Sequence, residues 1–67
     1  MEITIKDEFI KLGQLLKLAD LVDSGAHAKE VITEGLVKVN GETDLRRGRK
    51  CVRGDKVEFQ GKVIEVV

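Results

Sequence analysis

The chain has 67 residues, and its twelve basic and twelve acidic side chains give a formal net charge of zero. This length allows one domain with a thin core, so we expect residues 1–67 to form a single domain. The sequence has no apolar run of about 18 residues and no basic-then-apolar leader, which predicts a soluble cytoplasmic protein, neither membrane-bound nor exported. The single cysteine, Cys51, cannot form an internal disulfide, which fits a reducing compartment.

Two periodic patterns open the chain. In residues 1–6, Ile3 and Ile5 alternate with polar residues, which predicts a strand with one buried face. From Lys11 to Val22 the apolar residues recur at intervals of three and four, which predicts a helix with one buried face. These apolar positions are Leu12, Leu15, Leu16, Leu18, Ala19 and Val22.

A second helix is predicted to follow Ser24 and to run through about Glu34. Ser24 comes after the turn-forming Asp23, and a serine hydroxyl is a preferred N-cap. Gly35 stands where a helix needs a left-handed residue in order to stop. The expected inner face of this helix consists of Ala28, Val31 and Ile32.

The remaining residues follow the two-residue period of β-strands. Val37 and Val39 flank Lys38, and Asn40-Gly41 supplies the two positive-φ residues of a tight type I′ turn. Further strands are expected at residues 50–53, 56–59 and 63–67, with Gly54-Asp55 turning the first of them back to pair with the second. The predicted fold class is therefore α+β, with two short helices packed on a small, mostly antiparallel sheet in the order β-α-α, followed by several β-strands.

The charge of the chain is strongly segregated along the sequence. Residues 46–56 hold six of the twelve basic residues and a single acid, Asp55, which gives a local sum of plus five. Residues 1–45 hold five basic and nine acidic side chains, and residues 57–67 hold one and two, so the flanking sums are minus four and minus one. Dense guanidinium groups match phosphate oxygens and release counterions on binding, which makes nucleic acid the first partner to consider.

The ordered features of the chain resemble the S4 RNA-binding domain, a family named after a ribosomal protein of the small subunit. The resemblance covers about residues 9–59. Its most specific part is the combination of Ser24, Gly35, the Val-x-Val-Asn-Gly run at residues 37–41 and Gly54-Asp55. Residues 12–20 and the Arg-Arg-Gly-Arg-Lys run at residues 46–50 are most similar to small stand-alone bacterial members.

The resemblance implies an L-shaped (alpha-L) pair of helices docked on the sheet, with RNA held against the helices and the adjoining strand. It implies a basic contact from Lys11 at the start of the first helix and a helix start at Ser24. It also implies contacts from Lys29 on the second helix and Lys38 on the strand before Asn40, both able to line one face.

Two positions depart from the family pattern. Gly25 stands where the wider family often has Arg or Lys, and Gly13 stands where an acid often follows the leucine of the first helix. Since Gly25 removes the usual helical phosphate contact, we hypothesise that the arginines from Arg46 onward substitute for it.

General chemistry points to an overlapping set of residues. A helix start near Ser24 presents unpaired amides, and the small residues Gly25 and Ala26 let a phosphate approach the backbone. Strand alternation is expected to turn either Arg53 or Lys56 away from the surface that binds RNA. The candidate RNA-binding residues are Lys11, Ser24, Gly25, Ala26, Lys29, Lys38, Arg46, Arg47, Arg49, Lys50 and Arg53.

An enzyme is not predicted. His27 is the only histidine, and no converging cysteine, histidine or carboxylate pair accompanies it. Glu30 and Glu34 are interpreted as a solvated helix face, and Cys51 is interpreted as a strand residue. The two aromatic residues, Phe9 and Phe59, lie in apolar patterns typical of core positions, which disfavours a single-strand binder that stacks bases.

We therefore expect a non-catalytic monomer that binds structured RNA, either ribosomal RNA or a ribosomal particle. No cofactor, metal, membrane or small-molecule substrate is implied. The competing hypothesis is a protein-interaction adaptor that docks on an acidic protein surface. Cations gathered on one face would favour RNA, whereas scattered cations would favour the adaptor.

Overall fold

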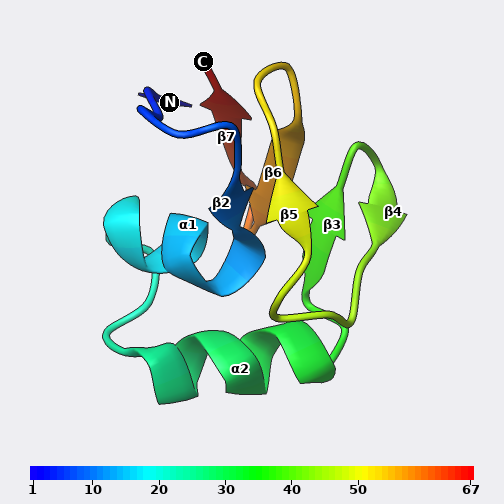
Figure 1. The fold of residues 1–67 in the computed structure, drawn as a ribbon. Helices are drawn as coiled ribbons and strands as arrows, with labels where there is room; N and C mark the ends of the chain where they lie inside the picture. Colours follow the sequence, from blue (N-terminus) through cyan, green and yellow to red (C-terminus); the bar gives the residue numbers. More distant parts are fainter.

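The computed structural model describes all of residues 1–67 as two helices and seven short strands (Figure 1). In chain order they are β1 (Glu2–Ile3), β2 (Ile10–Lys11), α1 (Leu12–Leu18), α2 (Gly25–Thr33), β3 (Val37–Val39), β4 (Glu42–Thr43), β5 (Lys50–Cys51), β6 (Lys56–Phe59) and β7 (Lys62–Val66). The predicted α+β class is confirmed. Sequence patterns do not predict β2 and β4, because two residues are too few to show an alternation.

Five strands form one sheet in the order β1-β7-β6-β3-β4, and β2 and β5 form a separate antiparallel pair. All neighbours in the large sheet are antiparallel except β1 and β7, which run parallel. This pairing brings the two ends of the chain side by side (Figure 1). The first strand is shorter than the predicted residues 1–6, although the amide of Ile5 still donates to Val67 O at 3.1 Å.

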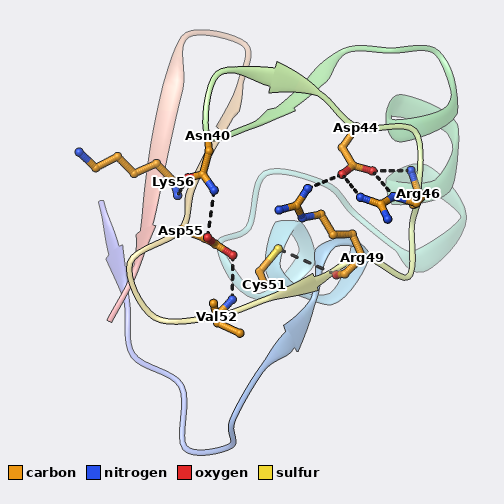
Figure 2. A network of polar contacts seen from close by, with 8 residues as sticks. All are labelled: Asn40, Asp44, Arg46, Arg49, Cys51, Val52, Asp55 and Lys56. Carbon is orange, nitrogen blue, oxygen red and sulfur yellow. Dashed lines mark hydrogen bonds and ion pairs between the residues drawn. The ribbon is translucent and has the colours of Figure 1, made fainter.

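The expected pairing of residues 50–53 with residues 56–59 is wrong. β6 lies between β3 and β7, so both of its edges are occupied, and β5 pairs with β2 instead. Asp55 redirects the chain between β5 and β6, because its carboxylate accepts hydrogen bonds from the amide of Val52 and the side chain of Asn40 (Figure 2). The Asn-Gly and Gly-Asp motifs, which lie apart in the sequence, therefore hold each other in the fold.

The helix α1 ends four residues before the predicted Val22. Asp20 adopts a left-handed conformation at φ 60°, its amide donates to Lys17 O, and the amide of Leu21 donates to Leu16 O. This is the Schellman pattern, with an aspartate where glycine is usual. The apolar period continues to Val22 because that side chain still reaches the core, where it is 3% exposed.

The predicted limits of α2 are confirmed at both ends. The Ser24 hydroxyl accepts a hydrogen bond from the amide of His27 at 3.1 Å, which is the expected N-cap contact. Gly35 takes φ 78°, and the amides of Gly35 and Leu36 donate to Ile32 O and Val31 O. A second Schellman pattern therefore ends this helix.

Sixteen buried apolar residues form one core between the helices and the inner face of the large sheet. The sheet contributes Val37, Val39, Val57, Phe59, Ile64 and Val66, which alternate with outward-facing residues along their strands. The turn at Asn40 and Gly41 has the predicted positive φ values of 53° and 85°. Neither helix has the length and apolar character that a bilayer-spanning segment needs.

A substitution pair on α1 tests this core. Leu16 is 0% exposed and Leu18 is 58% exposed on the same helix. Leu16→Ala should lower the free energy of unfolding by about 2–5 kcal/mol, a large part of the roughly 3–10 kcal/mol expected for a domain of this size. Leu18→Ala should change it by less than about 0.5 kcal/mol. Urea unfolding followed by circular dichroism measures both, and equal losses would contradict this assignment of the core.

Candidate nucleic-acid interface

The basic run of the sequence forms a loop that lies against the first turn of α1. We call residues 44–49, between β4 and β5, the arginine loop. The amide of Leu12 donates to Arg49 O at 2.8 Å, and the amide of Gly13 donates to Arg47 O at 3.1 Å. The first amides of a helix have no partner within the helix, and Lys11 provides no side-chain cap for α1. The loop therefore caps the helix with its own backbone.

Gly13 permits this close approach. A Cβ atom at Gly13 would lie 3.0 Å from Cγ of Arg47, which is tighter than ordinary van der Waals contact. This close approach accounts for a glycine at the position after Leu12.

Asp44 holds the arginine loop from inside (Figure 2). Its carboxylate accepts hydrogen bonds from the amide, Nε and Nη2 of Arg46 at 2.9, 3.1 and 2.9 Å, and from Nη1 of Arg49 at 2.8 Å. The hydrogen bond from the Arg46 side chain is the largest cause that holds the pKa of Asp44 well below its usual range, and it outweighs the opposing effect of burial. One carboxylate thus binds two guanidinium groups, and these three side chains sum to plus one.

A groove beside the loop brings together basic residues from separate elements. It is lined by Lys11, Gly13, Gln14, Lys17, Gly25, Arg47 and Gly48. Arg46, Gly48, Arg49 and Lys50 line a second hollow, which adjoins the groove because the two share Gly48. No acidic side chain lines either depression. The starts of both helices and the arginine loop therefore meet on one electropositive surface, which we call the basic surface.

Sequence reasoning missed Lys17. Gln14 and Lys17 are exposed and three residues apart on α1, so they lie on the same face of the helix. The available signal was this pair of polar positions, which flank the buried Leu15 and Leu16 on the helix that Lys11 precedes.

Lys50 rests on an aromatic ring. Its Nζ atom lies 4.8 Å from the centroid of Phe9, a cation–π contact that positions the ammonium group. Phe59 occupies the core as predicted, with 2% exposure, whereas Phe9 is only half-buried beneath Lys50.

Other predicted residues lie away from the basic surface. Lys38 alternates with the buried Val37 and Val39 and pairs with Glu58 on β6, so it lies on the outer face of the sheet, opposite the core. Arg53 donates a hydrogen bond from Nη2 to Ile5 O at 2.6 Å. The structure does not bring these two residues into either depression.

The start of α2 contributes unequally to the basic surface. Gly25 lines the groove, and Ser24 and Ala26 flank it, although the Ser24 hydroxyl is occupied as the N-cap. Lys29 is exposed one turn further along the helix, on the same side as Gly25.

The remaining reactive side chains have structural partners. Nδ1 of His27 accepts a hydrogen bond from the amide of Asp23 at 3.2 Å. Burial is the main cause that raises the pKa of Cys51 to about 11, which keeps it a thiol at neutral pH, and the residue lies in β5 as interpreted. No group of three or more histidine, cysteine and carboxylate side chains is arranged to hold a metal ion.

Comparison with known sequences identifies the proteins that this chain resembles. The family model of the S4 domain matches residues 3–67. The chain is 54% identical over 59 residues to a Bacillus subtilis protein named probable ribosome maturation protein RlbA, covering 88% of this chain and 83% of that protein. It is 44% identical over 62 residues to the putative RNA-binding protein YbcJ of Escherichia coli, covering 92% of this chain and 89% of that protein.

Solved structures agree with the sequence comparison. The solution structure of E. coli YbcJ, described as revealing an alpha-L motif involved in RNA binding, matches with a TM-score of 0.75 and 40% identity over 98% of this chain and 85% of that one. The 30S ribosomal protein S4e of Thermoplasma acidophilum matches with a TM-score of 0.70 and 29% identity, over 92% of this chain and 33% of that one. Since the family model covers nearly all of the residues and the relatives share both sequence and fold, the chain belongs to the S4 domain family.

Proposed function

We propose that this protein binds structured RNA through phosphate and shape contacts, and that its natural target is ribosomal RNA or a ribosomal particle. The observation that carries the proposal is the convergence of Lys11, Lys17 and Arg47 in one groove, directly beside the hollow of Arg46, Arg49 and Lys50. A chain with no net charge thereby concentrates positive charge on one surface. Such a surface attracts a polyanionic backbone and gains free energy by releasing its counterions.

The relatives support both parts of the proposal. One relative is named as a probable ribosome maturation protein and another as a putative RNA-binding protein. The matching YbcJ structure is described by a motif involved in RNA binding. These names support RNA as the partner and the ribosome as its source.

The side chains on the basic surface favour structured RNA over an unpaired strand. Double-stranded RNA is recognised mainly by its shape, phosphates and 2′-hydroxyls, which need donors and cations. Binding of unpaired bases instead relies on exposed aromatic rings, and here Phe59 is buried while Phe9 lies beneath Lys50. We place this activity in the cytoplasm and assign it to a monomer without a catalytic step or a cofactor.

The competing adaptor hypothesis has less support from the sheet. On the outer face, Lys38 lies opposite Glu58 and Lys56 lies opposite Glu65, so positive and negative groups alternate. Such a face offers no single-signed patch for an acidic protein.

RNA binding and adaptor binding can be separated by purifying the protein and treating it with nuclease and high salt. Loss of 260 nm absorbance after treatment supports RNA binding, and a protein partner that stays bound after nuclease supports the adaptor.

Crosslinking in cells followed by sequencing of the bound RNA identifies the target. Enrichment of ribosomal RNA is the expected result. Enrichment of other structured RNAs would keep the binding activity and refute the ribosomal target.

Salt titrations test which cations contact phosphate. Arg47→Gln and Lys50→Gln should each weaken binding to a fluorescently labelled RNA stem-loop and reduce the log–log salt slope by about 0.7–0.9, the contribution of one phosphate contact. Lys62→Gln is the matched control, because Lys62 is exposed on β7 and lines neither depression. Fluorescence anisotropy at several potassium chloride concentrations measures the slope. Equal slopes in all three variants would contradict the proposed basic surface.

A further inference from the structure

Asp44 is the one buried charged side chain of the protein, with 6% exposure. A buried carboxylate is costly unless it is paired and hydrogen-bonded, and Asp44 meets this condition through its contacts with Arg46 and Arg49. However, a carboxylate next to the basic residues 46–56 lowers the positive charge that would attract RNA. Its presence there calls for an explanation other than attraction of the ligand.

The contacts of Asp44 join three parts of the fold. Its amide donates to Val37 O at 3.1 Å, which ties the start of the arginine loop to β3. Its carboxylate binds Arg46 and Arg49, and the amide of Arg49 donates to Arg46 O at 3.2 Å, which closes the loop on itself. The carbonyls of Arg47 and Arg49 then dock on α1. The carboxylate therefore sits at the centre of a link between the sheet and the first helix.

This arrangement divides the first four cations of residues 46–56 into two groups. Arg46 and Arg49 are both paired with Asp44, and their side chains are 71% and 29% exposed, respectively. Arg47 and Lys50 form no ion pair, and each lines one of the two depressions. The pair bound to Asp44 sets the shape of the loop, whereas no carboxylate neutralises the charges of Arg47 and Lys50.

We propose that Asp44 is a positioning residue for RNA binding: with Arg46 and Arg49 it forms an internal clamp that presents Arg47 and Lys50 to phosphate. This rests on the proposed function. The clamp and simple electrostatics predict opposite changes in RNA affinity when Asp44 loses its charge. Removing a negative charge from a basic surface should tighten RNA binding if charge alone matters, whereas removing the clamp should weaken it.

The clamp can be tested without RNA by its pH dependence. Because the pKa of Asp44 is lowered in the folded protein, its contribution to stability is complete above the ordinary value of 3.8 and is lost as the pH falls towards the lowered pKa. Asp44→Asn should therefore lose less stability than the wild type when urea unfolding is compared at neutral pH and at pH values below 3.8. Parallel acid-side losses in the two proteins would contradict the clamp.

The decisive experiment compares Asp44→Asn with Glu42→Gln by anisotropy on the labelled RNA stem-loop. Both variants remove one negative charge, but Glu42 is exposed on β4 and forms no ion pair. An asparagine amide cannot accept the two-pronged contact of Arg46, because one of its atoms is a donor. Asp44→Asn should bind about tenfold more weakly, with a salt slope lower by about one. Glu42→Gln should match the wild type or bind slightly more tightly.

Gly13→Ala provides a second variant in case Asp44→Asn does not fold. It displaces Cγ of Arg47 from the other side of the loop without changing any charge, and alanine favours the helix. Circular dichroism should show a folded protein, and anisotropy should show RNA binding weakened several-fold with a lower salt slope. A merely structural role for the loop would leave the slope of a folded variant unchanged.

The outcomes separate this proposal from the proposed function. Unchanged or tighter binding by folded Asp44→Asn overturns the clamp while leaving RNA binding intact. If that variant is unfolded, unchanged binding by Gly13→Ala overturns it. If the wild type and Glu42→Gln both fail to bind the stem-loop in a salt-dependent way, RNA binding fails and the positioning role fails with it.

Discussion

The docking of the arginine loop on the first turn of α1 is the contact on which the basic surface depends. A helix start needs acceptors for its free amides, and α1 has neither a capping side chain nor an acid in its first turn. The carbonyls of Arg47 and Arg49 provide those acceptors. Since backbone atoms make the contact, the guanidinium groups stay available for other partners. The need to cap the free amides of α1 therefore places the arginine loop, with its positive charge, beside the starts of both helices.

The small core limits how such a surface can be built. Sixteen buried apolar residues stabilise the domain without a disulfide, and its only cysteine is one of them. Both helices end in Schellman patterns, in which backbone hydrogen bonds fix the end of a short helix with few additional residues. Asp44 is the only polar or charged side chain that is buried in the domain. That one carboxylate is placed where a loop of like charges would otherwise repel itself.

Charge segregation in the sequence indicated the correct segment but not the roles of its members. Six cations look alike in residues 46–56, yet the fold gives them different partners. Arg46 and Arg49 meet Asp44, Arg53 meets the carbonyl of Ile5, and Lys50 meets the ring of Phe9. Each partner lies at a different separation along the chain. Whether a cation is bound or free depends on which group lies next to it in the fold. The periodicity of the sequence does not reveal that neighbour.

Local physics determined much of this protein from its sequence alone. The N-cap at Ser24, the stop at Gly35 and the turn at Asn40-Gly41 depend on the conformational preferences of single residues, so they could be predicted. Strand pairing could not, because β5 meets β2 only once β6 has both edges filled. The end of α1 at Leu18, just before the left-handed Asp20, and the meeting of Lys17 with Arg47 in one groove likewise came from tertiary structure. These features depend on contacts between residues far apart in the chain, which no local pattern encodes.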